Sequence, residues 1–345
     1  MAAPPRYEIE HVVTSIREDD NDDVRFTVRC NGKVFYIRLS PSNFINSPSM
    51  TNKYMSYLEV LKSGQEILGE IYDTDVWDWV MAPFEPFFTN LAPDPSVETI
   101  TVTLKEYLYP DFFVFILDII DDKLQPRLVP TDESPYWPSF VRFDDDFLDD
   151  LETWTTLYDP AGIIISHKVP KDALFKAPKK VLIDKGHTEC FFKRCYGSVQ
   201  ITQELKTYQK IHEAGLDSQV NVCRLYGIVM DDCDFILGLL LTYVDCSDRP
   251  LSARVHPEEP DDPMPAVRER WMGQLETALS ALHENHIIWG DVKAENVLID
   301  QNEDAWLVDF GGGYTEGWVD KEVAGTVMGD FTGMAKLRAL LFPTK

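Results

Sequence analysis

The chain is poor in positive charge. Its 345 residues include 58 acidic residues against 32 lysines and arginines, which gives a formal net charge of −26 at pH 7. A surface with this balance repels the phosphates of nucleic acids and the anionic head groups of membranes. We therefore expect neither a nucleic acid nor a membrane as a partner. The acidic excess could attract a cationic substrate, but a solvated, solubilising surface is the favoured interpretation.

Paired cysteines and long apolar runs are also missing. The six cysteines form no CxxC pair, which is typical of reduced thiols in an intracellular protein rather than of a disulfide framework or a zinc site. The longest strongly apolar run, residues 235–244, is too short to cross a bilayer and suits a buried strand. The N-terminal residues lack the basic and apolar regions of a signal peptide. These absences together predict a cytoplasmic location.

The first part of the chain has the patterns of a mixed α/β domain. Residues 6–39 alternate like strands, and Asn31-Gly32 predicts a hairpin turn between two of them. Residues 50–92 have helical spacing with aromatic anchors. Residues 112–120 are strongly apolar and could form a strand or a helix. With 44% hydrophobic residues, the chain can bury a sizeable core and is long enough for two domains.

A segment rich in proline and aspartate follows over residues 121–150. Its two aspartate clusters, residues 144–146 and 149–150, could hold a metal, but they lack the glycine and the terminal glutamate of a calcium loop. We interpret the segment as a solvated linker. Residues 1–150 are then an N-terminal domain of unknown role, and residues 151–345 are a second domain.

The most informative stretch is residues 286–313, which read HIIWGDVKAENVLIDQNEDAWLVDFGGG. Asp291 is followed by Lys293 and Asn296, then by an apolar strand pattern. A second apolar run ends in Asp309-Phe310-Gly311. Phosphoryl transfer requires a carboxylate for the attacking hydroxyl, a cation near the moving phosphoryl group, and oxygen ligands for magnesium. These residue types occur here in the order and spacing of a catalytic loop followed by a metal-binding turn.

On these residues the chain resembles the protein-kinase-like superfamily, and the wording DFGGGYTEGWVDKE is similar to kinase-like proteins of filamentous fungi. The resemblance covers about residues 180–335. It implies an α+β, two-lobed protein-kinase-like fold, with an N-lobe at about 160–244 and a C-lobe at about 245–345. The C-lobe is expected to be short, because few residues follow Asp309. The N-terminal domain is expected to pack against this kinase-like part.

The resemblance also implies where the elements of the N-lobe and the helix before the catalytic loop lie. Their expected positions are three strands at 162–169, 180–184 and 190–195, a helix at 201–214, strands at 222–229 and 235–244, and a helix at 266–285. Asp330, near the end of the chain, is expected to brace the catalytic loop by hydrogen bonds.

Roles in the catalytic loop follow from the resemblance. Asp291 would orient or deprotonate the acceptor hydroxyl, and Lys293 would offset charge on the transferring phosphoryl group. Asn296 and Asp309 would ligate Mg²⁺. Chance spacing of turn residues is the competing explanation, and the ordered pair of motifs between apolar strands argues against it.

Roles in binding ATP are implied for residues further upstream. Lys193, in the expected third strand, would contact the nucleotide phosphates, and Glu204 would pair with it. Tyr243 and Val244 would lie at the hinge against the adenine ring. An ordinary surface lysine is the alternative for Lys193. Glu213 competes with Glu204 for the pairing role, and either glutamate could be an exposed helical residue.

Three features depart from the family pattern. The segment between the first two expected N-lobe strands, VPKDALFKAPKK, contains no glycine, so backbone amides cannot approach phosphates as they do in a glycine-rich loop. Gly290 stands where the family has arginine, which implies that phosphorylation of the following segment does not switch the protein. No Ala-Pro-Glu motif follows Asp309.

The leading hypothesis is an ATP- and Mg²⁺-dependent phosphotransferase. The short C-lobe favours a small-molecule acceptor over a protein, and phosphorylation could also activate a substrate for a second step. The alternatives are a pseudokinase that serves as a scaffold or binding module, supported by the missing glycine loop, and a kinase fold recruited for other chemistry. The sequence does not indicate the oligomeric state.

Overall fold

The computed structural model describes residues 7–14, 22–95, 100–132, 134–135, 137–247, 249–256 and 262–343. The chain divides into two compact units. Unit 1 comprises residues 1–138 and 163–178, and unit 2 comprises residues 139–162 and 179–345. The backbone therefore passes from one unit to the other three times. None of the helices in the described ranges combines the length and apolarity that a membrane span requires.

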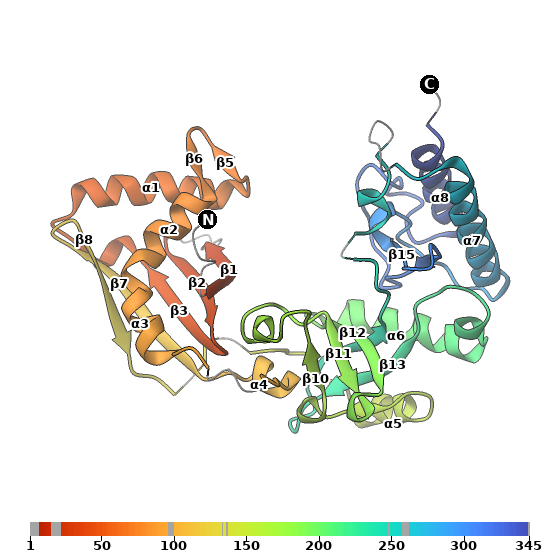
Figure 1. The fold of residues 1–345 in the computed structure, drawn as a ribbon, viewed down its shortest axis with the longest axis horizontal. Coiled ribbons are helices and arrows are strands. Elements are labelled where there is room, and N and C mark those ends of the chain that lie inside the picture. Colours follow the sequence, from red (N-terminus) through yellow and green to blue (C-terminus); the bar gives the residue numbers. More distant parts are fainter. Residues whose placement is uncertain are drawn as a thin grey trace. The chain divides into compact units, whose positions relative to one another are not determined.

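Unit 1 is built on a six-stranded sheet (Figure 1). Its strands are β1 (Tyr7–Thr14), β2 (Val24–Cys30), β3 (Lys33–Leu39), β4 (Phe44–Ile45), β7 (Phe112–Ile120) and β8 (Lys123–Val129). Asn31 and Gly32 join β2 to β3 with φ values of 47° and 78°, so the predicted hairpin is confirmed. Strand β7 runs parallel to β3 and antiparallel to β8, which resolves residues 112–120 as a strand.

Helices cover one face of this sheet. The helical prediction for residues 50–92 is confirmed as α1 (Pro48–Ser63), α2 (Asp73–Met81) and α3 (Glu85–Leu91), with the short strands β5 (Ile67–Leu68) and β6 (Ile71–Tyr72) between α1 and α2. Tyr54, Val80 and Phe88 of these helices share one buried cluster with Phe26 and Phe115 of the sheet. A short helix, α4 (Leu104–Leu108), precedes β7.

The prediction of a solvated linker over residues 121–150 is wrong. Its first part is β8, and residues 139–162 belong to unit 2, where Val141 and Leu151 are each only 2% exposed. The aspartates begin α5 (Asp145–Glu152), since Asp144 accepts a hydrogen bond from the amide of Phe147 at 2.9 Å. Carboxylates at a helix N-terminus satisfy free amides and complement the helix dipole.

Residues 163–178 group with unit 1. The expected first strand of the N-lobe is observed as β10 (Ile164–Ser166), which stands first in the strand order β10-β11-β12-β14-β13-β9, and further hydrogen bonds join the segment to residues of unit 1. The amide of Leu104 donates to the carbonyl of Ile163 at 2.8 Å, and the amide of Gly32 donates to the carbonyl of Leu174 at 2.8 Å. Residues 169–178 of the glycine-free segment thus group with unit 1, and its last two residues, Lys179 and Lys180, group with unit 2.

Unit 2 has the two lobes that the sequence predicted. The sheet of its N-lobe contains, in spatial order after β10, the strands β11 (Lys180–Ile183), β12 (Thr188–Arg194), β14 (Ile236–Thr242), β13 (Leu225–Met230) and β9 (Leu157–Tyr158), and helix α6 (Ser198–Glu213) follows β12. Gly227 of β13 permits the parallel pairing with β9, because a Cβ there would come within 2.4 Å of the Tyr158 ring.

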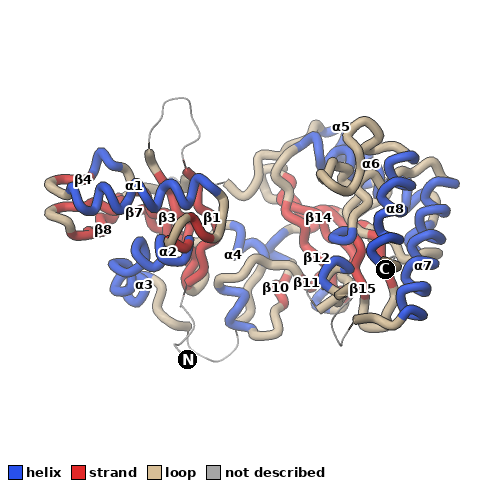
Figure 2. The backbone as a smooth tube through the Cα atoms, turned by 90° about the horizontal axis from the view of Figure 1, so that it is seen from above, coloured by secondary structure: helices blue, strands red, loops and turns tan. Residues whose placement is uncertain are grey.

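The C-lobe contains two long helices and a small hairpin. Helix α7 (Pro265–Glu284) and helix α8 (Val327–Leu341) run beside each other, as Figure 2 shows, and the hairpin is β15 (Val297–Ile299) and β16 (Ala305–Leu307). Trp271, Leu275 and Leu282 of α7 are fully buried in one core that both lobes share. The two-lobed protein-kinase-like fold is confirmed. The loop 285–296 belongs to its C-lobe.

Candidate active site

The loop that carries Asp291 is held by one buried carboxylate of α8. Asp330 is 1% exposed and accepts hydrogen bonds from the backbone amides of Trp289 and Gly290, each at 2.9 Å. His283, at the end of α7, lies 2.8 Å from the same carboxylate through Nε2. The brace expected from the sequence is therefore present, and it fixes the backbone immediately before Asp291.

The structure explains why residue 290 is a glycine. Its φ is 87°, a backbone conformation in which an L-residue with a side chain is strained. A Cβ at this position would also lie 3.5 Å from the Cα of Gly312. The glycine that replaces the family's arginine thus suits both the left-handed turn before Asp291 and the close passage of the segment after Asp309.

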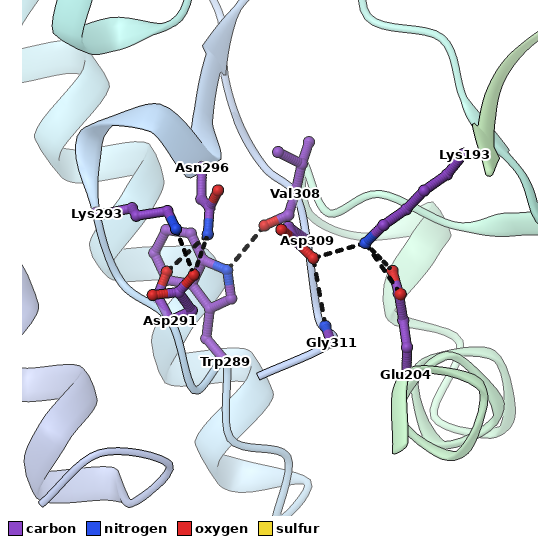
Figure 3. A network of polar contacts seen from close by, with 9 residues as sticks. All are labelled: Lys193, Glu204, Trp289, Asp291, Lys293, Asn296, Val308, Asp309 and Gly311. Atoms are coloured by element: carbon purple, nitrogen blue, oxygen red, sulfur yellow. Dashed lines mark hydrogen bonds and ion pairs between the residues drawn. The ribbon is translucent and has the colours of Figure 1, made fainter. Parts of the chain in front are cut away.

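Asp291 lies at the centre of a polar network (Figure 3). Its Oδ2 accepts from Lys293 Nζ at 2.6 Å and from Asn296 Nδ2 at 3.1 Å, and Asn296 Nδ2 also donates to the Asp291 carbonyl at 2.9 Å. Thr315 closes the network, because its hydroxyl donates to Asp291 Oδ1 at 3.1 Å and accepts from Lys293 at 3.0 Å. The orientation of the Asp291 carboxylate is consequently fixed by three side chains.

Thr315 is the residue of this network that the sequence analysis missed. It lies in the segment after the Asp309-Phe310-Gly311 turn, where no spacing rule relates it to Asp291. A polar residue shortly after that turn was the only available signal, and it did not distinguish Thr315 from its neighbours.

A second network surrounds Lys193 on β12. Lys193 Nζ lies 2.8 and 2.9 Å from the two carboxylate oxygens of Glu204 on α6 and 2.7 Å from Oδ1 of Asp309. Figure 3 shows Lys193 between the two carboxylates. The geometry brings Glu204 to Lys193, whereas the competing Glu213 is exposed at the last turn of α6.

For Lys193 and Glu204 alike, burial and the opposite charge of the partner shift the pKa in opposite directions. Burial disfavours the charged form of Lys193, but Glu204 and Asp309 outweigh it and raise the pKa of the ammonium group. Burial also raises the pKa of the Glu204 carboxyl, against the effect of Lys193. We favour the ionised pair, because Lys193 contacts both carboxylate oxygens of Glu204.

The packing of the next residue, Phe310, anchors the turn around Asp309. Asp309 has a φ of 63°, which is uncommon for a residue other than glycine. Phe310 is 1% exposed, and its ring packs edge-on against Tyr208 of α6 with centroids 5.7 Å apart. Because Phe310 packs against α6, the backbone at Asp309 is held in this conformation, and its carboxylate lies towards Lys193.

The two networks border a cavity of about 430 Å³ within unit 2. Lys193, Asn296 and Asp309 line it on one side, and Tyr243 and Val244, directly after β14, line it on another. Further lining comes from apolar side chains of both lobes, namely Phe191, Leu241, Leu298 and Val308. A mostly apolar cavity with a few polar groups is typical of a site for a small molecule or cofactor.

The oxygen atoms near Asp309 fit a magnesium ion. Asn296 uses its amide nitrogen on Asp291, so its amide oxygen points away from that residue (Figure 3). Asp309 uses Oδ1 on Lys193, which leaves Oδ2 as a second oxygen donor. Across the described ranges, no group of three or more His, Cys, Asp or Glu side chains could hold a metal. Mg²⁺ commonly takes only one or two protein oxygens, with phosphates and waters as its other ligands.

Close packing of α8 against the catalytic loop depends on Gly333. A Cβ at this position would lie 2.5 Å from Val292 Cβ and 2.9 Å from the Val292 carbonyl oxygen, one residue after Asp291. We therefore expect Gly333→Ala to lower the free energy of unfolding by about 1–3 kcal/mol and to reduce activity, because the loop must shift. Urea unfolding measures the first effect.

Gly273 provides the matched control for that substitution. It is an exposed glycine inside α7, and a Cβ there would meet no other atom within 4 Å. Gly273→Ala is expected to raise the free energy of unfolding by roughly 0.5–1 kcal/mol, as alanine does in an open helical site. Equal effects of the two substitutions would contradict the close contact at Gly333.

Comparison with known proteins agrees with this geometry. Residues 180–327 match the family model of the protein kinase domain. A shorter stretch of 43 residues is 42% identical to a protein of Encephalitozoon cuniculi (strain GB-M1) described as a probable serine/threonine-protein kinase KIN1 homolog. This match covers 12% of the present chain and 8% of the relative, so it relates one segment of the two proteins.

Proposed function

We propose that the protein is an ATP- and Mg²⁺-dependent phosphotransferase. One observation carries the proposal: Lys193 contacts both Glu204 and Asp309, and Asp309 borders the same cavity as Asn296, which hydrogen-bonds Asp291. A single connected site therefore offers groups for the nucleotide phosphates, for a magnesium ion and for an acceptor hydroxyl. The match to the protein kinase domain supports the same reaction class.

The acceptor side of the reaction falls to Asp291. Its carboxylate would accept a hydrogen bond from the acceptor hydroxyl and take up the proton as the hydroxyl oxygen bonds to the γ-phosphorus of ATP, while the bond from that phosphorus to the bridging oxygen breaks and ADP leaves. Lys293, whose Nζ lies 2.6 Å from Asp291 Oδ2, would offset the charge of the transferred group. Asn296 holds Asp291 in place through its amide nitrogen, so the carboxylate is oriented before the acceptor arrives.

The nucleotide side falls to the residues around the cavity. Tyr243 and Val244 would border the adenine ring, and Lys193 would bind the α- and β-phosphates. Asn296 and Asp309 would hold Mg²⁺, which when bound neutralises charge on the phosphates. The ion pair between Lys193 and Glu204 orients the lysine, which lines the cavity.

We extend the proposal to a small hydroxyl-bearing acceptor. The segment after Asp309 passes close to Asp291, because Thr315 bonds to its carboxylate and a Cβ on Gly313 would come within 3.4 Å of Asp291 Oδ2. A compact hydroxyl compound needs to displace only the Thr315 hydroxyl. A folded protein would have to displace the segment itself.

Calorimetric titration of the full-length protein with ATP, with and without Mg²⁺, tests the proposal. Binding is expected to be tighter with Mg²⁺. Asp309→Ala is expected to weaken binding in Mg²⁺ by about tenfold, the value of one charge-assisted interaction, and to change Mg²⁺-free binding much less. Glu213→Ala, an exposed carboxylate on α6, serves as the control and should leave both affinities unchanged.

A different result would point to the alternative functions. If ATP at millimolar concentration gives no heat and no shift in melting temperature, the phosphotransferase proposal is wrong. The fold would then serve as a pseudokinase scaffold or for other chemistry in the cavity. Mg²⁺-dependent binding that survives in Asp309→Ala would keep the nucleotide site but contradict the metal ligand proposed here.

A further inference from the structure

Two arginines face each other on the sheet of unit 1. Arg25 of β2 and Arg38 of β3 are cross-strand partners in the antiparallel register. Side chains in such positions have Cβ atoms about 4.5–5.5 Å apart, and like charges placed there destabilise a sheet. Their neighbours Val24, Phe26 and Ile37 point into the core beneath the helices, so the two arginines lie on the opposite face of the sheet.

The other arginines on this face have carboxylate partners. Arg29 donates to Glu10 at 2.7 Å, and Arg127 donates to both oxygens of Asp118, at 2.6 and 3.1 Å. For Arg25 and Arg38 the described residues provide no ion pair, and Nε of Arg25 is buried without a hydrogen-bond partner. A buried donor is costly unless it finds an acceptor, and an anion bound beside Arg25 would supply one.

A hollow of about 670 Å³ opens over this pair. Besides Arg25 and Arg38, its lining offers hydrogen-bonding groups from Thr14, Ser42 and Asn43. Asp23 is the one carboxylate in the lining, so the described walls carry more positive than negative charge. This is unusual on a chain whose net charge is −26. Such a local reversal of sign favours a bound anion over a solvated patch.

The arrangement of donors favours phosphate over carboxylate. A guanidinium group presents a planar fork that binds two oxygens of an anion side by side. A carboxylate has only one such edge and satisfies one fork. A phosphate group has several edges and can bind two guanidinium groups at once. We propose that the hollow over β2 and β3 is a binding site for a phosphate-bearing small molecule, held between Arg25 and Arg38.

Equilibrium binding of radiolabelled inorganic phosphate to the full-length protein tests this site, with chloride at matched ionic strength as the reference. Phosphate is expected to bind with a Kd below about 10 mM, and Arg38→Gln should weaken it by at least about tenfold. Arg38 is exposed, so its substitution does not threaten folding. Arg25→Gln should weaken binding by a similar factor.

Two control variants locate the binding. Arg127→Gln removes an arginine of the same face that already pairs with Asp118, and it should change the Kd by less than about twofold. Lys193→Ala removes the phosphate-binding lysine of the nucleotide pocket, and it should also leave this binding intact. Phosphate binding that disappears in Lys193→Ala but persists in Arg38→Gln would overturn the proposal and assign the phosphate to the nucleotide pocket.

Thermal unfolding gives a second measurement. Without phosphate, Arg38→Gln should melt at or above the wild-type temperature, because it removes one of two facing charges. In saturating phosphate the wild type should melt higher than the variant, since only the wild type gains from binding. The same order of melting temperatures in both buffers would overturn the proposal.

Ligand choice provides the last arms of the test. Phosphoserine that binds as tightly as inorganic phosphate, or more tightly, would indicate a phosphate monoester as the natural ligand, and phosphate alone would indicate the free ion. Acetate that competes equally would refute the preference for phosphate. Absence of any binding to the wild type would also refute the site.

Discussion

Asp291→Ala should abolish most phosphoryl transfer while ATP still binds. General-base catalysis by a positioned side chain contributes about 10²–10⁴-fold, so we expect kcat to fall by roughly that factor. The carboxylate lies 2.6 Å from Lys293 Nζ, and Asp291 is not among the residues that line the cavity with Lys193, Tyr243 and Val244. The ATP affinity should therefore stay close to that of the wild type. Single-turnover transfer from labelled ATP and calorimetry measure the two quantities.

Asp320→Ala is the matched control for this experiment. Asp320 is an exposed aspartate of the segment that follows Asp309, and its substitution should leave both transfer and ATP affinity unchanged. If Asp291→Ala retained full activity, the assignment of the acceptor site to the C-lobe would be refuted. Loss of ATP binding together with activity would instead mean that the variant disrupts the loop.

Asp330→Ala should have the largest effect on stability. The carboxylate is 1% exposed and accepts from the amides of Trp289 and Gly290 and from His283. Truncation leaves these buried donors without an acceptor, at about 1–3 kcal/mol each. We expect the free energy of unfolding to fall by roughly 2–5 kcal/mol. Activity should fall as well, because Gly290 precedes Asp291.

Asp330→Asn separates the two contributions of that side chain. The amide keeps one oxygen acceptor in nearly the same volume but turns a donor towards one of the three partners. Its stability and its activity should lie between those of the wild type and Asp330→Ala, as measured by urea unfolding and by kcat. An alanine variant whose unfolding free energy stays within about 0.5 kcal/mol of the wild type would contradict the brace.

The sequence predicted short-range relations well. Asp291, Lys293 and Asn296 lie within six consecutive residues, so their mutual contacts depend on one loop, and the motif identified them. Lys193 and Glu204 depend on how α6 packs against β12, and here two glutamates competed. Glu204 and Glu213 are nine residues apart, so they lie about 180° apart around the helix, and only one of them can face the buried side. The burial of Leu205 and Tyr208 selects Glu204.

Relations across the chain were harder to predict. Thr315 reaches Asp291 only because the segment after Asp309 turns back over the loop, and no local pattern signals that path. The aspartate clusters near residue 145 resemble a linker in composition, yet they begin a helix that buries Leu151. Strand β9 contributes only two residues to its sheet, too few to produce an alternating pattern. The packing of residues 1–150 against the kinase-like part stays a prediction.

The three passages of the backbone between the units also limit how the protein can be cut. A fragment that begins at residue 155 lacks Val141 and Leu151, which unit 2 buries, and it lacks Gly32 and Val102 of unit 1, which hydrogen-bond residues of the segment 163–178. No single cleavage point yields either unit whole. Gene fusions or deletions that transfer the kinase-like half alone would include part of the core of unit 1 or omit part of the core of unit 2. The two units must therefore be expressed and purified together.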